Sequence, residues 1–110
     1  MSDDLPSFAM EVRPDGQRIV VKPIGELDLI TVLGVREQIQ ELLNDGWRDV
    51  IVDLRAVTFM DSSGVHLLLD TRRAVAEHHA ELAIVDGTQP VKQVLELTGV
   101  SDWFTRATDV

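Results

Sequence analysis

Two adjacent hydroxyl groups lie in the segment Asp61-Ser62-Ser63-Gly64, between an apolar run at residues 50–54 and a helical pattern that begins at Val65. The first N–H groups of a helix lack partners within the helix and carry the positive end of its dipole, so a phosphate placed there is stabilised. A serine that a modifying enzyme can reach at this point could act as a switch, because phosphorylation adds negative charge that a partner can sense. We therefore expect the function of this chain at this segment.

A purely structural role for the same segment has to be kept open. One serine hydroxyl would cap a helix amide and the other would meet water, while Asp61 would favour the positive end of the helix. The two interpretations are compatible, because one serine can cap while its neighbour stays exposed. Asp28 has a similar ambiguity: it could cap an earlier helix or line the same surface as Ser62.

The motifs required for several enzymatic functions are missing from the sequence. A serine hydrolase needs glycine two residues before its nucleophile, and those positions hold Met60 and Asp61. His66 lies in the same predicted helix as the serines, with nothing to orient it as a base. Neither G-x-x-x-x-G-K-[ST] nor G-x-G-x-x-G occurs. We predict a protein that is not an enzyme.

Asp53 ends a buried strand, as the phosphorylated aspartate of a receiver domain does. A receiver also needs an acidic pair after its first strand and five strand–helix units. Here the first predicted strand ends in Arg13-Pro14-Asp15-Gly16, and only three helices are predicted. The sequence therefore favours a strand-end carboxylate for Asp53.

Composition narrows the possible partners. The chain has 110 residues, a net charge of −9 and no cysteine. A phosphate backbone would be repelled, and no apolar run reaches the length of a membrane span, so we expect neither nucleic acid nor membrane as partner. We predict one cytoplasmic domain over residues 1–110, with a flexible tail at 1–6, and neither cofactor nor metal. The adjacent His78 and His79 would point apart on a helix and could not easily share an ion.

Hydrophobic periodicity predicts alternating strands and helices after an opening hairpin. Two β-branched runs, at 8–13 and 17–24, flank Pro14-Asp15-Gly16. Helical spacing follows from Val32 to Leu43, with a cap near Asp28 or Thr31 and an end at residues 44–46. The run at 50–54 predicts a strand buried on both faces in mid-sheet.

A second helix is expected from Ser62 or Ser63 to about residue 79, followed by a strand at 81–85. Pro90 fits the first turn of a third helix that Gly99 ends. Trp103 and Phe104 would open a last strand or form an apolar lid. The predicted fold is α/β, with a four- or five-stranded mixed sheet that opens with an antiparallel hairpin and is flanked by three helices.

Four motifs, in order, carry a resemblance to a known family: G-E-L-D at 25–28, V-D-L at 52–54, F-M-D-S-S-G at 59–64 and V-K-Q-V-L-E-L-T-G-V at 91–100. From about residue 8 to 104 the chain resembles the bacterial anti-sigma-factor antagonists, which define the STAS domain. The third motif is the most specific of the four. The resemblance implies the mixed sheet flanked by helices that the periodicity also predicts.

The resemblance also implies a mechanism. In that family the serine directly after the aspartate, here Ser62, is phosphorylated by an anti-sigma factor that is also a serine kinase, and a protein phosphatase reverses the step. The unmodified form binds the anti-sigma factor and frees the sigma factor. By position the partner-binding surface would comprise Asp28, Asp61, Ser62, Ser63 and Gly64. The sequence leaves one alternative open, a STAS signalling module that binds a nucleotide, a small ligand or a larger signalling complex without sigma-factor control.

Overall fold

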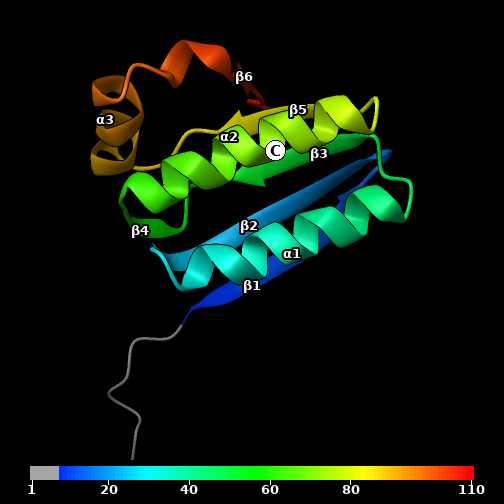
Figure 1. Ribbon diagram of the computed structural model, residues 1–110, viewed down its shortest axis with the longest axis horizontal. Coiled ribbons are helices and arrows are strands. Elements are labelled where there is room, and N and C mark those ends of the chain that lie inside the picture. The colour runs from blue at the N-terminus through cyan, green and yellow to red at the C-terminus, as the bar shows by residue number, and fades with distance from the viewer. Residues whose placement is uncertain (1–7) are drawn as a thin grey trace, which may run out of the picture.

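The computed structural model describes residues 8–110, so the flexible tail predicted at 1–6 lies outside the described residues. Strands and helices alternate after an opening hairpin, as the sequence predicts, except that a second short strand follows directly on β3 (Figure 1). The elements are β1 (Ala9–Asp15), β2 (Arg18–Leu27), α1 (Thr31–Asn44), β3 (Asp49–Asp53), β4 (Val57–Met60), α2 (Ser62–Glu77), β5 (Glu81–Val85), α3 (Gln89–Leu97), the 3-10 turn η1 (Ser101–Trp103) and β6 (Thr105–Arg106).

The strands form a mixed sheet in the order β1-β2-β3-β5-β6, and β4 pairs separately with the end of β2. β1 and β2 are antiparallel, as expected for a hairpin, whereas the pairs β2–β3, β3–β5, β5–β6 and β2–β4 are parallel. The predicted fold class is confirmed, with two short strands, β4 and β6, that bring the described sheet to six strands.

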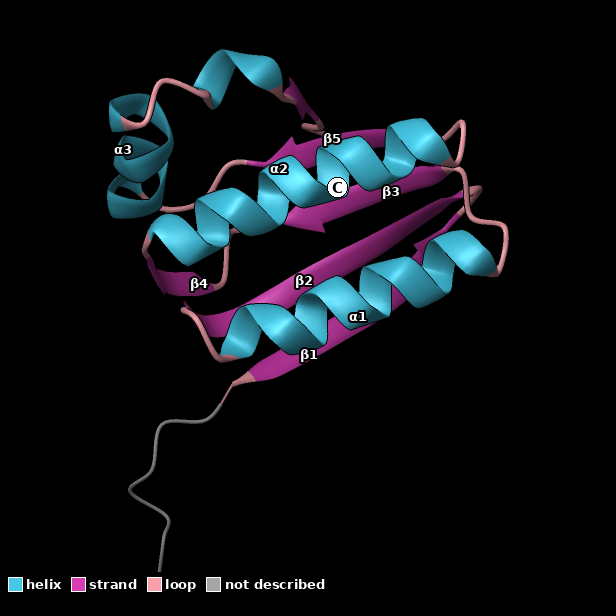
Figure 2. Cartoon of the chain, viewed as in Figure 1, coloured by secondary structure: helices cyan, strands magenta, loops and turns pink. Residues whose placement is uncertain are grey.

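Helices α1 and α2 lie side by side over one face of this sheet (Figure 2). Their buried side chains recur every three or four residues, which gives each helix one apolar stripe toward the sheet. Val35 and Ile39 of α1 and Leu68 and Val75 of α2 join the strand residues in the main hydrophobic core. α3 packs at the end of the sheet against β4.

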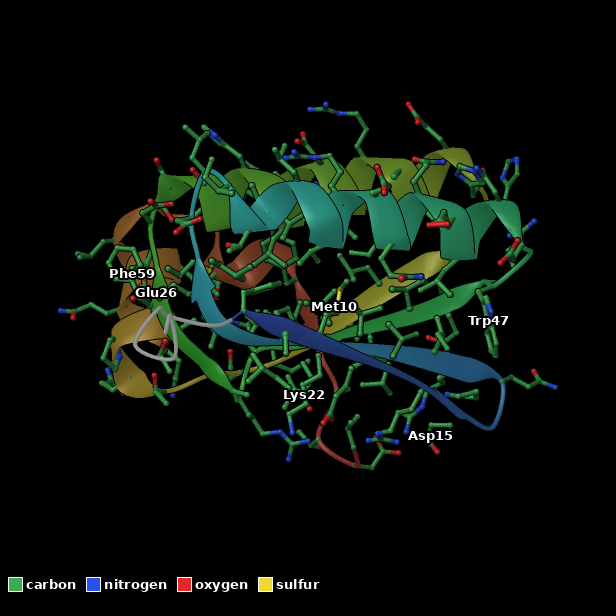
Figure 3. All side chains as sticks on the ribbon, turned by 90° about the horizontal axis from the view of Figure 1, so that it is seen from below. Met10, Asp15, Lys22, Glu26, Trp47 and Phe59 are labelled. Carbon is green, nitrogen blue, oxygen red and sulfur yellow. The ribbon has the colours of Figure 1, made fainter. Side chains whose placement is uncertain are left out.

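The C-terminal segment crosses the opposite face of the sheet, as Figure 3 shows from below. There Ala107 and Val110 pack on a smaller apolar cluster of Val20, Ile51 and Val85. Because helices cover one face and this segment covers the other, β3 is buried on both, which confirms the predicted mid-sheet strand.

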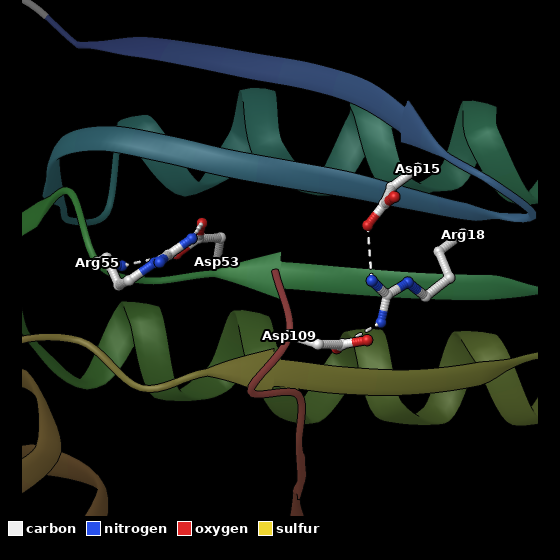
Figure 4. A network of polar contacts seen from close by, with 5 residues as sticks. All are labelled: Asp15, Arg18, Asp53, Arg55 and Asp109. Carbon is white, nitrogen blue, oxygen red and sulfur yellow. Dashed lines mark hydrogen bonds and ion pairs between the residues drawn. The ribbon is translucent and has the colours of Figure 1, made fainter.

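An arginine holds this segment in place (Figure 4). The Arg18 guanidinium donates to Asp15 at 2.6 Å within the hairpin and to Asp109 at 2.9 Å in the tail. The backbone N–H of Ala107 also donates to the carbonyl of Ile84 at 2.9 Å. The last residues of the chain are therefore tied across the sheet.

The third helix begins at Gln89 with Pro90 in its first turn, as predicted, and Gly99 follows its end with φ of 78°. A strand that opens at Trp103 is wrong, because Trp103 closes η1 and β6 begins only at Thr105. Phe104 is buried in the core, whereas Trp103 is 54% exposed and lies 5.6 Å beneath the Arg72 guanidinium. The indole is thus a surface group rather than a core residue.

Candidate functional site

Helix α2 starts at Ser62, and Asp61 is its N-cap residue. Asp61 has extended backbone angles, and its carboxylate accepts a hydrogen bond of 2.8 Å from the backbone N–H of Ser63. Its carbonyl also accepts the N–H of Gly64 at 3.1 Å. Asp61 therefore satisfies the first amides of the helix, which is what aspartate does best at this position.

The expectation that a serine hydroxyl caps this helix is wrong, because the carboxylate of Asp61 occupies that role. Ser62 is exposed, and Ser63 is half-buried. Within residues 8–110, neither hydroxyl has a hydrogen-bond partner that would hold it in place. The Ser62 side chain therefore lies at the surface without a hydrogen bond to the rest of the described chain.

Asp28 lies next to Asp61 across two paired strands. β2 and β4 run parallel with Leu27 opposite Met60, and the backbone N–H of Asp61 donates to the carbonyl of Leu27 at 3.4 Å. Asp28 and Asp61 are the residues that follow each strand, so the starts of α1 and α2 meet at one end of the sheet. Asp28 and Ser62 are therefore brought to the same end of the molecule.

Asp28 also shapes the turn into α1, although it is not the N-cap residue of that helix, which is Ile30. Its carboxylate accepts the backbone N–H of Ile30 and of Thr31, each at 3.0 Å. The Thr31 hydroxyl in turn donates to the carbonyl of Glu26 at 2.6 Å. The hydrogen bond from the Thr31 amide, together with the others, lowers the pKa of Asp28, so this half-buried carboxylate stays ionised at neutral pH.

Gly64 is buried in the first turn of α2, and its role is one of packing. A Cβ at this position would lie 2.2 Å from Cγ and 2.7 Å from Sδ of Met60. Any larger residue would therefore require the buried side chain of Met60 to move. Gly64 thereby sets the position of the exposed serine two residues before it.

Exposed apolar side chains cluster at the same end of the sheet, and sequence reasoning missed them. We call Leu29, Ile30, Leu33 and Phe59 the apical apolar group; they are 71, 72, 58 and 48% exposed. Three belong to the entry and first turn of α1, and Phe59 lies on β4 opposite Glu26 (Figure 3). Leu33 could have been found from the sequence, because it lies directly after Val32 and off the buried stripe of α1.

Beyond the carboxylates of Asp28 and Asp61, few charged side chains follow Ser62 along α2. The first two turns of α2 contain one titratable side chain, His66, which is exposed. The next acidic residue, Asp70, is bound by Arg36 of α1 at 3.0 Å and by Arg73 at 3.6 Å. Among residues 8–110 no three His, Asp or Glu side chains are grouped closely enough to hold a metal ion. In the same part of the chain, no helix has the length and apolar character needed to span a bilayer.

Asp53 lies away from this end and is already paired. Its carboxylate, 1% exposed, accepts the Arg55 side chain at 3.0 and 2.8 Å and the Arg55 backbone N–H at 3.1 Å (Figure 4). Burial alone would raise the pKa of Asp53, but these hydrogen bonds outweigh it and the pKa is lowered. The pairing supports the strand-end role predicted for this residue.

Comparison with known proteins agrees with this geometry. The STAS domain model matches residues 8–110. The chain is 37% identical over 82 residues to the anti-sigma-B factor antagonist of Staphylococcus aureus strain NCTC 8325 / PS 47, which covers 74% of this chain and 76% of that protein.

Two solved structures of one protein have the same fold. The unphosphorylated form of the anti-sigma factor antagonist SpoIIAA superposes with a TM-score of 0.78 and 26% identity, over 92% of this chain and 90% of that one. The phosphorylated form of SpoIIAA from Bacillus superposes with a TM-score of 0.70 and 25% identity, over 92% of this chain and 93% of that one. Because the family model matches all of the described residues, 8–110, this protein belongs to the STAS domain family.

Proposed function

We propose that this chain is an anti-sigma factor antagonist controlled by phosphorylation of Ser62. The unphosphorylated form binds an anti-sigma factor that is also a serine kinase, and the sigma factor is released. Phosphorylation of Ser62 ends the binding, and a protein phosphatase restores it. The observation that carries the proposal is the exposed Ser62 hydroxyl, left free because Asp61 caps the helix.

The chemistry of the switch belongs to the partner, and this chain supplies the acceptor. The Ser62 Oγ attacks the γ-phosphorus of ATP held by the kinase, the bond from that phosphorus to the β,γ-bridging oxygen breaks to release ADP, and the hydroxyl proton passes to a base of the kinase. A kinase must reach the oxygen from solvent, and the exposure of Ser62 at the first position of α2 supports this. In this scheme the chain is a substrate and a binding protein, not an enzyme.

The apical apolar group supports a protein partner at the same end. Exposed Leu29, Ile30, Leu33 and Phe59 would lose water on contact with a matching surface, which favours association. Phosphorylation would place about −1.5 to −2 charges beside these side chains and beside Asp61 and Asp28. A hundredfold loss of affinity requires only about 2.8 kcal/mol, which one badly placed interfacial charge can supply.

The relatives support the same role. The staphylococcal protein is named an anti-sigma-B factor antagonist, and SpoIIAA, an anti-sigma factor antagonist, has been solved both unphosphorylated and phosphorylated. A fold that exists in both states in a relative is consistent with a phosphorylation switch here.

The test is to incubate the protein with candidate anti-sigma factor kinases and ATP, and to map any phosphate by mass spectrometry. We expect one phosphate on Ser62, no phosphorylation of Ser62→Ala and normal phosphorylation of Ser63→Ala. Binding to the same kinase, measured by calorimetry, should fall about a hundredfold in the phosphorylated protein. Phosphate on another residue, or none with a kinase that binds tightly, would refute the proposal.

The alternative is a STAS module that binds a nucleotide or another small ligand. A surface hollow of about 420 Å³ lies beside Asp28 and is lined by seven residues that include Glu26, Thr31 and Thr58. Its two charged lining residues are both acidic, which disfavours a nucleotide phosphate. A rise in melting temperature with ATP or GTP, without binding to any anti-sigma factor kinase, would favour this alternative.

A further inference from the structure

His66 is placed to act on a phosphate carried by Ser62. Both residues are exposed and lie four positions apart in α2, which runs without interruption from Ser62 to Glu77. Side chains four residues apart are neighbours on one helical face. The Cα–Cβ bonds of a helix tilt toward its N-terminus, so the imidazole of His66 leans toward Ser62.

A phosphate on Ser62 would have few other positively charged or hydrogen-bond-donating partners at the start of α2. Asp61 already takes the N–H of Ser63 and adds a like charge, so the helix terminus is not an empty anion site. Arg36 and Arg73 are bound to Asp70. Within the described chain, the segment from Asp61 to Leu69 contains no other basic side chain than His66.

We propose that His66 is the counter-ion of phosphorylated Ser62, so that this chain stabilises its own modified form through a bond within α2. The inference rests on the proposed function for its biological meaning, but the pair itself can be tested without any kinase. An imidazolium at this position donates to a phosphate oxygen and offsets the repulsion from Asp61.

The effects of other charged neighbours have to be separated from this one: Asp28 at the start of α1, Asp70 on α2, and Lys92 and Glu96 on α3. Asp70, one turn beyond His66, lies on the same face of α2, where Arg36 and Arg73 already pair with it. From α3, which packs against α2, Lys92 and Glu96 are the charged residues, and β4 contributes none. Lys92 is the basic residue of α3 and is therefore the other cation to test.

The experiment uses protein with phosphoserine installed at position 62 during translation, which makes it independent of the kinase. The pH midpoint of the phosphoserine 31P resonance is measured in the parent and in His66→Gln. We expect the midpoint in the parent to be lower by about 0.3 pH unit or more, because a neighbouring cation favours the dianion. Glutamine keeps the helix propensity and the polarity of the position.

Two control variants complete the design. His79→Asn removes an exposed histidine beyond the end of α2, where φ is 56° and asparagine is tolerated, and it should leave the midpoint unchanged. Lys92→Gln tests the competing cation and should also leave it unchanged. An equal midpoint in the parent and His66→Gln, or a shift with Lys92→Gln alone, would overturn the proposal.

A second readout is the melting temperature of four proteins. They combine serine or phosphoserine at position 62 with histidine or glutamine at position 66. We expect phosphorylation to lower the melting temperature more when position 66 is glutamine. Equal lowering in both backgrounds would show that His66 contributes nothing. If the histidine pair is found but no kinase modifies Ser62, the proposed function fails and the pair stands.

Discussion

The carboxylate of Asp61 accepts the backbone N–H of Ser63 at 2.8 Å, and this bond separates the structural role of the segment from its functional one. The helix start is satisfied by an aspartate, so the neighbouring Ser62 hydroxyl is not needed for folding. A residue that folding does not need can be modified without unfolding the domain.

Replacement of Asp61 and of Ser62 should therefore have different effects on stability. Asp61→Ala should lower the free energy of unfolding by about 1 kcal/mol because the cap is lost. Asp61→Asn should lower it much less, because asparagine also caps a helix. Ser62→Ala should change it by less than about 0.5 kcal/mol. Urea denaturation measures all three, and a large loss in Ser62→Ala would show that the serine has a structural role after all.

Two glycines offer a matched pair for the packing of α2. Gly64→Ala should cost about 1–3 kcal/mol, because its Cβ would lie 2.2 Å from Cγ of the buried Met60. Gly34 is an exposed position of α1, and no atom lies within 4 Å of a Cβ added there. Gly34→Ala should therefore raise the free energy of unfolding by about 0.5–1 kcal/mol. Thermal denaturation of both variants checks the signs, and a neutral Gly64→Ala would mean that Met60 adjusts freely.

The apical apolar group should matter for binding and not for folding. Leu33 is 58% exposed, so Leu33→Gln should leave stability nearly unchanged but weaken binding to the anti-sigma factor kinase at least about tenfold. Val12→Thr, at a 37% exposed apolar position on β1, is the control and should bind normally. Calorimetry against an anti-sigma factor kinase that phosphorylates the parent protein separates the two variants, and equal affinities would place the partner on another surface.

The Asp53–Arg55 pair should make stability depend on pH in the acid range. The pKa of Asp53 is lowered in the fold, so the pair contributes fully above the unfolded value of about 3.9 and is lost as pH falls through the lower folded value. Arg55→Met should cost about 1–3 kcal/mol at pH 7, because the buried carboxylate loses two donors.

The difference in the free energy of unfolding between the parent and Arg55→Met should shrink below pH 4, where Asp53 is already protonated in the unfolded chain. Unfolding by urea at pH 7, 5, 4 and 3 measures it, with Arg13→Met on the exposed face of β1 as the control. A constant difference across this range would contradict the assignment of the lowered pKa to this pair.

Much of the fold could be predicted from local patterns. Residues 50–54 are apolar apart from Asp53 and show no polar alternation, and the structure buries them between helices and the C-terminal segment. The spacing of Val32, Val35 and Ile39 predicts one buried stripe, and α1 has it. The short strand β4 and the true start of β6 were missed, because four and two residues carry too little periodicity to identify a strand.

The sequence by itself determined the order of the longer elements and the helix start at residues 61–64, since these follow from spacing and residue type along the chain. The choice of Ser62 over Ser63 came from the resemblance to the family. Only the tertiary structure decided that Asp61 rather than a serine caps α2, and that Asp28 lies beside it through the pairing of Leu27 with Met60. It also decided that Leu29, Ile30, Leu33 and Phe59 remain exposed at that end. Hydrogen-bond choice and exposure depend on which elements pack together, and contacts between distant segments leave no periodic signal in the chain.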